Sequence, residues 1–314
     1  MKIFHSIASF EASGLQSIAT IGTFDGVHIG HQEIIKNLVR QTVPGISQSV
    51  VLTFFPHPRM VLQDGSSLKM LSTLDEKIEL FENLGLDCLI IEPFTKEFSR
   101  LTARDFVRKI LVNSLKLKKL IIGYDHQFGR NREGNFEQLK EFGAFYNFEV
   151  DEIPAQDIKD IAVSSTKIRA ALNEGQIAKA NNYLGHIYHL SGTVVKGNGL
   201  GRKYHYPTVN LALTESYKLI PKEGVYVASC VLHGQRIYGI MNIGSRPTVD
   251  GHNQTIEVHL LDVEEDLYDQ TLTVALHLRL RDEQKFESLD ALFAQIKEDE
   301  KHARKLIKRG EISQ

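Results

Sequence analysis

The stretch GTFDGVHIGH, residues 22–31, decides how the first half of the chain is interpreted. It follows the short apolar run SIATIG, and it leads into QEIIKNLVR, where apolar residues recur at helical spacing. Its three glycines allow a tight turn and a close approach of the backbone to a ligand. The sequence therefore predicts a strand, a turn and a helix in direct succession.

Three further runs in the first half have the same character as that first strand. They are short and rich in Ile, Val and Leu: SVVLTFF (residues 49–55), DCLIIEPF (residues 87–94) and KKLIIGYD (residues 118–125). Such runs are typical of buried parallel strands. Segments with helical periodicity separate them. This alternation predicts a doubly wound, Rossmann-like α/β domain whose ligand site lies outside the carboxyl ends of its strands.

Two of the intervening helices carry recognisable start signals. In STLDEKIELFENLG (residues 72–85), Thr73 and Glu76 have the spacing of a capping box and Gly85 is a stop signal. In TARDFVRKILVNSL (residues 102–115), Thr102 and Asp105 repeat that spacing in a weaker form. Helices are expected over both segments.

The pattern changes near residue 185. IRAALNEGQIAKANNYLG (residues 168–185) predicts two short helices, and the chain after it is rich in β-branched residues with alternating polarity. We expect about six strands and a hairpin turn at His233–Gly234, which together predict a small antiparallel β-barrel. An amphipathic helix ends the chain, with these residues on one face: Leu289, Leu292, Phe293, Ile296, Ala303 and Ile307. The expected domains are residues 1–185 and 186–314.

Composition excludes several classes of protein. The net charge is −2, with 42% hydrophobic and 24% charged residues, so binding to nucleic acid by bulk charge is not expected. No apolar run is long enough to span a bilayer, and the N-terminus lacks the apolar core of a signal peptide. Cys88 and Cys230 are far apart in sequence, which indicates no disulfide framework. A cytoplasmic protein is expected; the oligomeric state is not indicated.

The two histidines of the first motif allow three interpretations. His28 and His31 are one helical turn apart, at a helix N-terminus whose free N–H groups attract anions. They can bind phosphate oxygens, they can be surface residues of an ordinary helix start, or they can begin a metal site, for which no third ligand is nearby. The stretch is no Walker A loop, because GxxxxGK[ST] does not occur.

A second stretch, GNGLGRKYHYPTVN (residues 197–210), combines glycines with basic residues. Such a loop suits ATP phosphates, although a mobile hairpin loop has the same composition. It is no Rossmann fingerprint, because the glycine spacing differs and a strand follows. Thr208 and Asn210 share one face of that strand, and the Thr208 hydroxyl is a ligand type that Mg²⁺ accepts.

The H-x-G-H arrangement of His28 and His31 after a first strand resembles the nucleotidylyltransferase superfamily. In that superfamily both histidines contact the ATP phosphates during adenylyl transfer. SSTKIR (residues 164–169) opens another expected helix and resembles the second phosphate-binding element of the superfamily. By itself, SST is also compatible with a simple helix N-cap.

Two more stretches resemble the FAD synthetase branch of that superfamily: TFFPHP (residues 53–58) and GYDHQFGRNREG (residues 123–134). In that branch the first lies along the flavin, and the second reaches both ATP and the flavin. Taken alone, they would be a rigid turn and a solvated basic loop. His126 stands where the family commonly has Phe.

PTVN (residues 207–210) resembles the P-T-A-N motif of the riboflavin kinase family, whose Thr and Asn bind Mg²⁺–ATP. Val209 replaces the usual Ala, and His205 stands where Gly is frequent. Downstream, GIMNIGSRPTVDG and TIEVHLLD continue the resemblance, which places Glu257 at the position of the general base. Without the resemblance, Glu257 would be an outward-facing strand residue.

The resemblance covers nearly the whole chain and implies a bacterial-type bifunctional riboflavin kinase and FMN adenylyltransferase. It assigns catalytic roles to His28, His31 and Glu257. The residues it assigns to nucleotide binding are Gly22, Phe24, Asp25, Gly30, Asp125, Ser164, Ser165, Thr166, Arg169, Lys196, Gly197, Gly201, Arg202, Thr208 and Asn210. Those assigned to the flavin are Phe54, His57, Phe128 and Arg281. Thr208 and Asn210 are also the expected Mg²⁺ ligands.

The implied activity converts riboflavin to FMN and FMN to FAD, each step with ATP and Mg²⁺. Two alternatives remain at this stage. One is an adenylyltransferase with a different acceptor and a non-catalytic barrel, and the other is a flavin-binding regulator without activity. Thr208, Asn210 and Glu257 together argue against an inert barrel. The expected partners are flavin and ATP, with neither nucleic acid nor membrane.

Overall fold

The structure is a computed structural model that describes residues 1–10, 14–63, 68–123, 127–153, 163–197, 201, 204, 206–248 and 251–312. For residues 132, 246–248 and 251–253 only the backbone is described. Contacts within the chain divide it into two compact units, Met1–Ser164 and Ser165–Gln314. The expected boundary after residue 185 falls at the end of α7 and stays a prediction.

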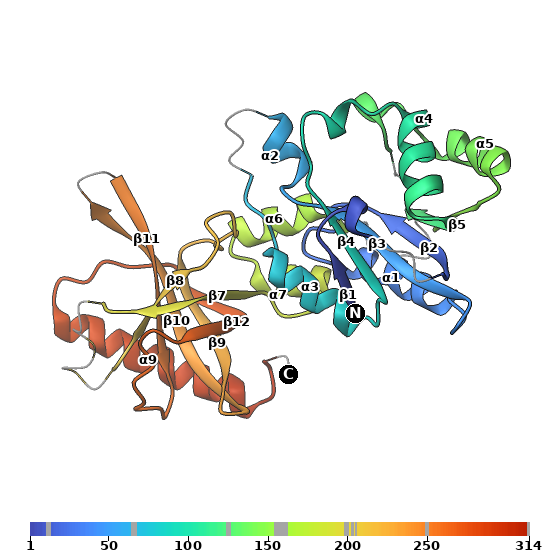
Figure 1. Cartoon of the computed structure of the whole chain (residues 1–314). Helices are drawn as coiled ribbons and strands as arrows, with labels where there is room; N and C mark the ends of the chain where they lie inside the picture. The colour runs from blue at the N-terminus through green and yellow to red at the C-terminus, as the bar shows by residue number, and fades with distance from the viewer. Residues whose placement is uncertain are drawn as a thin grey trace. The chain divides into compact units, whose positions relative to one another are not determined.

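The first unit is built on a parallel sheet of six strands in the order β1-β4-β3-β2-β5-β6 (Figure 1). The strands are β1 (Lys2–Phe4), β2 (Gln16–Ile21), β3 (Ser47–Phe54), β4 (Cys88–Glu92), β5 (Leu117–Gly123) and β6 (Glu149–Ile153). The predicted doubly wound α/β fold is confirmed. The strands β2 to β5 match the four apolar runs, whereas the edge strands β1 and β6 were not expected.

Helices cover both faces of this sheet. On one face, α1 (Ile29–Arg40) and α3 (Leu74–Asn83) bury an apolar cluster that includes Ile35, Leu38 and Phe81. On the other face, α4 (Ala103–Phe106), the π-helix η3 (Val107–Ser114) and α5 (Phe136–Tyr146) bury a cluster around Phe106 and Leu111. Shorter elements complete the unit: η1 (Ile7–Ser9), α2 (Pro58–Leu62), η2 (Phe98–Arg100) and η4 (Arg130–Arg132).

Local signals position these helices as the sequence predicts. The Thr73–Glu76 capping box is formed at the start of α3, and Gly85 follows the helix with φ +79°. Thr102 accepts a hydrogen bond from the Asp105 amide and caps α4. The order in which the chain adds strands to the sheet reverses at β2, because β2 pairs with β3 on one side and with β5 on the other. The Gly22–His31 turn leaves the carboxyl end of β2, where ligands of such sheets bind.

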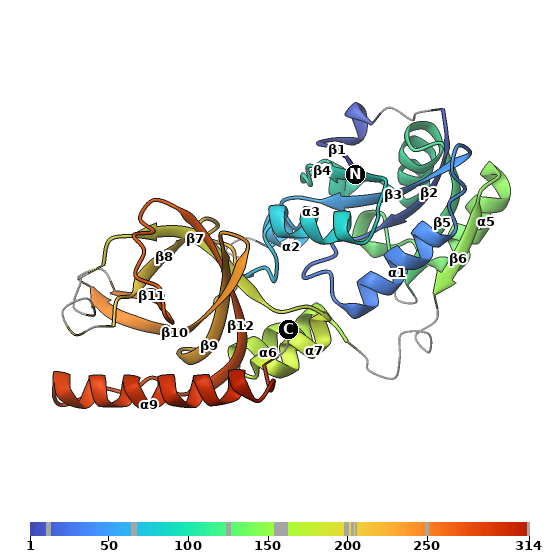
Figure 2. The same ribbon diagram turned by 90° about the horizontal axis from the view of Figure 1, so that it is seen from below.

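The second unit is a closed antiparallel barrel with strand order β10-β11-β8-β7-β12-β9 (Figure 2). Its strands are β7 (His189–Val195), β8 (Val209–Leu213), β9 (Gly224–Leu232), β10 (Gln235–Thr248), β11 (Gly251–Leu260) and β12 (Thr271–Arg281). His233 and Gly234 both have positive φ and form the predicted hairpin between β9 and β10. The expected barrel is therefore confirmed.

In the part of the chain that the structure describes, this unit includes the helices α6 (Ser165–Asn173), α7 (Ile177–Leu184) and α9 (Leu289–Lys308). In α7, Asn181 donates from Nδ2 to the Leu276 carbonyl of β12 and accepts at Oδ1 from the Tyr188 amide. This pair of hydrogen bonds anchors α7 on the barrel.

The terminal helix lies along the barrel (Figure 2), where Ala303 and Leu306 pack with β9 and β10 residues. The face predicted for it was partly wrong. Leu289 is 44% exposed, and Asp299 is buried although it is charged. The reason is an ion pair, because Asp299 accepts hydrogen bonds from the Arg281 guanidinium at 2.7–3.0 Å.

Candidate active sites

The turn after β2 has an unusual backbone. Phe24, Gly26 and Val27 have φ of +46°, +80° and +38°, so two side-chain-bearing residues adopt a left-handed conformation. Such a conformation costs on the order of 1–3 kcal/mol per residue and persists only where surrounding contacts enforce it. The contacts that hold this turn are therefore part of the site.

These contacts come from residues 71–77, before and within α3. The Asp25 carboxylate is 1% exposed and accepts hydrogen bonds from the Leu71 and Ser72 amides at 3.0–3.3 Å. The Gly26 amide donates to Ser72 Oγ at 3.1 Å. Lys77 Nζ donates to the Thr23 carbonyl at 2.8 Å. Asp25, predicted to bind nucleotide, thus points into the protein and fixes the turn.

The two histidines lie together at the start of α1. His28 is the N-cap residue, and its Nδ1 accepts from the His31 amide at 3.4 Å. The rings stack with centroids 3.6 Å apart and an interplanar angle of 17°. Burial, His28 and Lys77 hold the pKa of His31 well below its usual value. The His31 imidazole is therefore neutral near pH 7 and offers one N–H donor.

The other residues assigned to this turn support the same arrangement. Phe24 is buried, and its ring makes edge contacts with His31 at 5.1 Å and with Phe81 of α3 at 5.7 Å. Gly30 is buried in the first turn of α1. Gly22 lies so close to the Phe24 ring that an added Cβ would be 3.1 Å from it. The metal interpretation finds no support, since no group of three His, Cys, Asp or Glu among the described residues could hold a metal ion.

The aromatic residues expected near the flavin join one cluster at the carboxyl edge of the sheet. Phe54, at the end of β3, contacts Phe98 at 5.5 Å. Phe98 contacts Phe106, and Phe106 contacts Phe128 at 5.8 Å. Phe54 and Phe128 are thus connected through two phenylalanines that the sequence did not single out. Phe94, 5.6 Å from Phe54, is a further member.

His57 caps α2 by accepting from the Arg59 amide at 3.1 Å, next to a cis peptide bond between Phe55 and Pro56. Asp125 and His126 lie outside the described residues, so their expected roles stay predictions.

Ser165 and Thr166 open α6, directly after Ser164, and Arg169 lies one turn further along that helix. These four residues therefore sit at a helix N-terminus, as the phosphate-binding prediction requires.

The barrel brings the expected kinase residues into one row. Asn210 of β8 pairs directly with Glu257 of β11, and Glu257 pairs with Asn242 of β10. Partners directly opposite in an antiparallel pair point to the same face, about 5 Å apart. Asn210 and Glu257 are thus neighbours, although 47 residues separate their numbers in the sequence. Asn242 completes the row and was missed, because only the register reveals it.

Two glycines of the basic loop leave no room for a side chain. A Cβ on Gly197 would lie 2.1 Å from Asn210 Nδ2, and one on Gly201 would lie 2.1 Å from the Tyr206 carbonyl oxygen. Gly197 and Gly201 therefore lie directly against Asn210 and Tyr206. Lys196 is exposed, while Arg202, Lys203 and His205 lie outside the described residues.

Thr208 lines a cavity of about 440 Å³ between β8, β11 and the segment after β11. Pro207, Val209 and Val258 form other parts of its wall. The Pro207 carbonyl accepts from His259 Nδ1 at 2.8 Å, which fixes the residue before Thr208. Asn210 and Glu257 do not line this cavity. The Thr208 hydroxyl and the Asn210 amide oxygen, the two predicted ligands, are hard donors that fit Mg²⁺.

Aromatic rings hold this loop against the terminal helix. Tyr204 stacks on Phe293 of α9 with centroids 4.2 Å apart, and Tyr206 stacks on the same ring at 5.9 Å. Tyr206 also contacts His259 of β11. The terminal helix therefore supports the segment that leads to Thr208.

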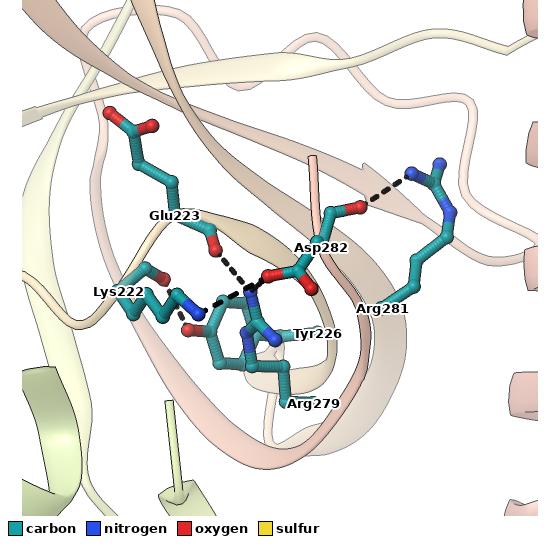
Figure 3. Close-up of polar contacts among 6 residues, drawn as sticks. All are labelled: Lys222, Glu223, Tyr226, Arg279, Arg281 and Asp282. Atoms are coloured by element: carbon teal, nitrogen blue, oxygen red, sulfur yellow. Dashed lines mark hydrogen bonds and ion pairs between the residues drawn. The ribbon is translucent and has the colours of Figure 1, made fainter. Parts of the chain in front are cut away.

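Arg281, expected near the flavin, is already engaged with protein groups. Its guanidinium binds Asp299 and the Asp282 carbonyl, and it points away from the neighbouring Arg279 cluster in Figure 3. In that cluster, Arg279 donates to Asp282 Oδ1 at 2.6 Å, and Lys222 pairs with the same carboxylate at 3.3 Å. These contacts join the start of β9 to the end of β12.

Family models match both halves of the chain. The FAD synthetase model matches residues 11–167, and the riboflavin kinase model matches residues 184–307. A bifunctional riboflavin kinase/FMN adenylyltransferase of Escherichia coli (strain K12) is 36% identical over 309 residues, with 98% of each chain covered. A bifunctional riboflavin kinase/FMN adenylyltransferase of Pseudomonas fluorescens is 38% identical over 307 residues, again with 98% of each chain covered.

The solved structure of a macrolide-efflux protein from Streptococcus pneumoniae is also similar. It aligns with a TM-score of 0.87 and 28% identity, covering 96% of this chain and 98% of that one. Among the described residues of the present chain, no helix has both the length and the apolar character required to cross a membrane.

Proposed function

The chain belongs to the family of bifunctional riboflavin kinase/FMN adenylyltransferases, and we propose that each half carries one of the two reactions. It is a transferase of FAD biosynthesis that uses ATP twice. The barrel phosphorylates riboflavin to FMN, and the α/β unit adenylylates FMN to FAD with release of pyrophosphate. The match of both family models in this order carries the conclusion.

In adenylyl transfer, a phosphate oxygen of FMN attacks the α-phosphorus of ATP. A new P–O bond forms, the bond from the α-phosphorus to the bridging oxygen breaks, and pyrophosphate leaves. We assign to His28 and His31 the binding of ATP phosphate oxygens, with the N-terminal amides of α1 beside them. Ser165, Thr166 and Arg169 are assigned to the departing phosphates. No covalent enzyme intermediate is needed, so positioning and charge stabilisation supply the catalysis.

In the kinase reaction, the 5′-hydroxyl of riboflavin attacks the γ-phosphorus of ATP, and ADP leaves. We assign to Glu257 the acceptance of the hydroxyl proton. The direct pairing of Glu257 with Asn210 supports this role, because the base then lies beside a proposed nucleotide ligand. Thr208 and Asn210 would hold Mg²⁺, which when bound with ATP neutralises charge on the β- and γ-phosphates.

The two alternatives are not favoured. A non-catalytic barrel does not agree with a riboflavin kinase match that spans the barrel. A regulator without activity does not agree with relatives that carry the names of both activities over 98% of the chain. We also propose a cytoplasmic location, which the two free, buried cysteines support, because disulfides are rare there.

The purified chain, incubated with riboflavin, ATP and Mg²⁺, is expected to form FMN first and FAD later. Chromatographic separation of the flavins over time measures this. FMN that is never converted would contradict the adenylyltransferase assignment. FAD from added FMN, with no product from riboflavin, would contradict the kinase assignment.

Two variants separate the reactions. His28→Ala is expected to lower FAD formation from FMN by on the order of a hundredfold or more, since a phosphate contact in the transition state is lost, and to leave FMN formation unchanged. Glu257→Gln is expected to lower FMN formation by a similar factor, and to leave the conversion of added FMN unchanged. If either variant kept its own reaction at the wild-type rate, that residue's role would be wrong.

A further inference from the structure

A buried lysine lies behind the first site. Lys77, in the first half of α3, is 3% exposed. Lysine is rarely buried to this extent without a specific partner, because removing an ammonium group from water is costly. The sequence patterns do not account for Lys77.

The contacts of Lys77 lie on the Gly22–His31 turn. Its Nζ donates to the Thr23 carbonyl at 2.8 Å, and Thr53 Oγ1 of β3 donates to the same oxygen at 3.4 Å. One helical turn further along α3, Phe81 packs against the ring of Phe24. Helix α3 thus holds Thr23 through the hydrogen bond from Lys77, and it holds Phe24, whose backbone is left-handed, through the ring of Phe81.

Lys77 also acts on His31. Its charge is one of three causes that lower the pKa of His31, after burial and the neighbouring His28. Burial lowers the pKa of Lys77 itself to about 8, an effect that Asp25 opposes. On its own helix, the adjacent Glu76 accepts from the Thr73 amide in the capping box. The titratable groups linked electrostatically to Lys77 are thus Asp25 and His31.

We propose that Lys77 is a positioning residue for adenylyl transfer: it holds the strained turn at the Thr23 carbonyl and places a buried positive charge beside His31. The first role keeps His28 and His31 where the ATP phosphates bind. The second helps to keep the His31 imidazole neutral, so that it meets phosphate as a hydrogen-bond donor. The proposal rests on the phosphate-binding role assigned to the two histidines.

Three variants of the full-length chain separate these roles. Lys77→Met removes both the charge and the donor. Lys77→Gln removes the charge and keeps an N–H donor, and Lys77→Arg keeps the charge above pH 8. Lys218→Met is the matched control, since Lys218 is also 3% exposed but lies in the second unit, over the ring of Tyr188.

The first readout is steady-state kinetics of both reactions. Lys77→Met is expected to lower kcat/KM for FAD formation from FMN at least tenfold at pH 7, with the fall in kcat, and to leave riboflavin phosphorylation within twofold of the wild type. On the acid side of the pH profile of FAD formation, Lys77→Met is expected to lose activity at a higher pH than the wild type, because His31 gains a proton more easily without the Lys77 charge. In Lys77→Arg, which keeps the charge, the acid side of the profile is expected to match that of the wild type. Lys218→Met should not change FAD formation.

The second readout is the titration of the His31 ring by NMR, with the signal identified by its absence in His31→Gln. In Lys77→Met and Lys77→Gln, the midpoint is expected to move to higher pH, because a repelling charge is gone. This shift would not follow from a merely structural role. It also reports on Lys77 when no substrate is present.

The outcomes are distinguishable. Wild-type protein that forms no FAD would overturn the proposed function, whatever Lys77 does. Normal FAD formation in Lys77→Met, or a His31 midpoint that does not move, would overturn the role of Lys77 alone. Should Lys77→Met and Lys77→Gln fail to fold, Lys77→Arg decides: a His31 midpoint that moves to higher pH in this variant, although the charge is kept, would overturn the proposal.

Discussion

At residue scale, Gly197 lies directly against Asn210 in the proposed kinase site. A Cβ at residue 197 would lie 2.1 Å from the Asn210 amide nitrogen, far inside contact distance. We therefore expect Gly197→Ala to displace Asn210 from its place beside Glu257. A misplacement of about 1 Å costs on the order of tenfold to a hundredfold in rate.

Rates of FMN formation with saturating flavin and varied ATP measure this effect. FAD formation from added FMN should be unchanged. Gly234→Ala is a control for the added methyl group, because its Cβ meets nothing within 4 Å; its φ of +78° adds a backbone strain that Gly197→Ala does not have. Equal kinase rates in Gly197→Ala and the wild type would show that the close contact with Gly197 does not fix the position of Asn210.

Lys77 makes the stability of the protein depend on alkaline pH. Its pKa is about 8 when folded and 10.5 when unfolded, so the unfolded state binds more protons between these values. The free energy of unfolding therefore rises with pH across this window, by at most about 3 kcal/mol. Lys77→Met should lack this rise. Urea unfolding of both proteins at pH 8, 9 and 10 measures the difference, and parallel pH dependences would contradict the expected burial of the charge.

The sequence predicted residues whose chemistry is local, and it missed those that act over a distance. His28 and His31 are recognisable because one turn of helix brings them together. Lys77 is 54 residues from Thr23, the residue it binds, and it looks like an ordinary charged position of an amphipathic helix. Asn242 was missed for the same reason, since only the strand register places it beside Glu257.

At the scale of elements, α9 supports the loop that leads into β8. The Phe293 ring stacks on Tyr204 and lies near Tyr206, two residues before Thr208. We expect Phe293→Ala to raise KM for ATP in the kinase reaction several-fold, since this loop loses its support. The loss of two aromatic contacts should also lower stability by about 1–3 kcal/mol.

Kinase kinetics and urea unfolding of Phe293→Ala test this role. Leu289→Ala, one turn earlier on the same helix, is the control, because Leu289 is 44% exposed and should change stability by less than about 0.5 kcal/mol. If both variants behaved alike, α9 would have no particular role in supporting the loop.

Elements with a strong apolar or capping signal were predicted, and weakly patterned ones were not. The four central strands of the sheet are buried, and their apolar composition predicts them. The edge strand β6 has one buried residue, Ile153, and β1 has none, so neither shows a strand pattern. The face of α9 was misjudged at Asp299, because burial of a carboxylate depends on a partner in β12 that the helix sequence cannot reveal.

At the scale of the whole molecule, the helices before the barrel contribute to its stability. Without α7, the Leu276 carbonyl and the Tyr188 amide lose their partner Asn181. Each buried polar group left unpaired costs about 1–3 kcal/mol. A fragment of residues 165–314 is therefore expected to have a Tm several degrees above that of residues 186–314.

Thermal unfolding of the two fragments, followed by circular dichroism, measures this difference. The comparison also tests the boundary expected after residue 185 against the division after Ser164. Equal Tm values would favour the later boundary. Asn181→Leu in the longer fragment is the control, since it removes the two hydrogen bonds and keeps the helix.

The register of the barrel has a consequence for changes of chain length. Side chains alternate between the two faces of β11, so deletion of one residue within it would turn Glu257 away from Asn210 and Asn242. A shift of β11 by one residue along its neighbours cannot bring Glu257 back beside Asn210 and Asn242, because β11 is hydrogen-bonded to β8 on one side and to β10 on the other. In a deletion scan, the strand interiors of the barrel should be intolerant even where substitutions are accepted. The hairpin at His233–Gly234, with open space around Gly234, should accept insertions.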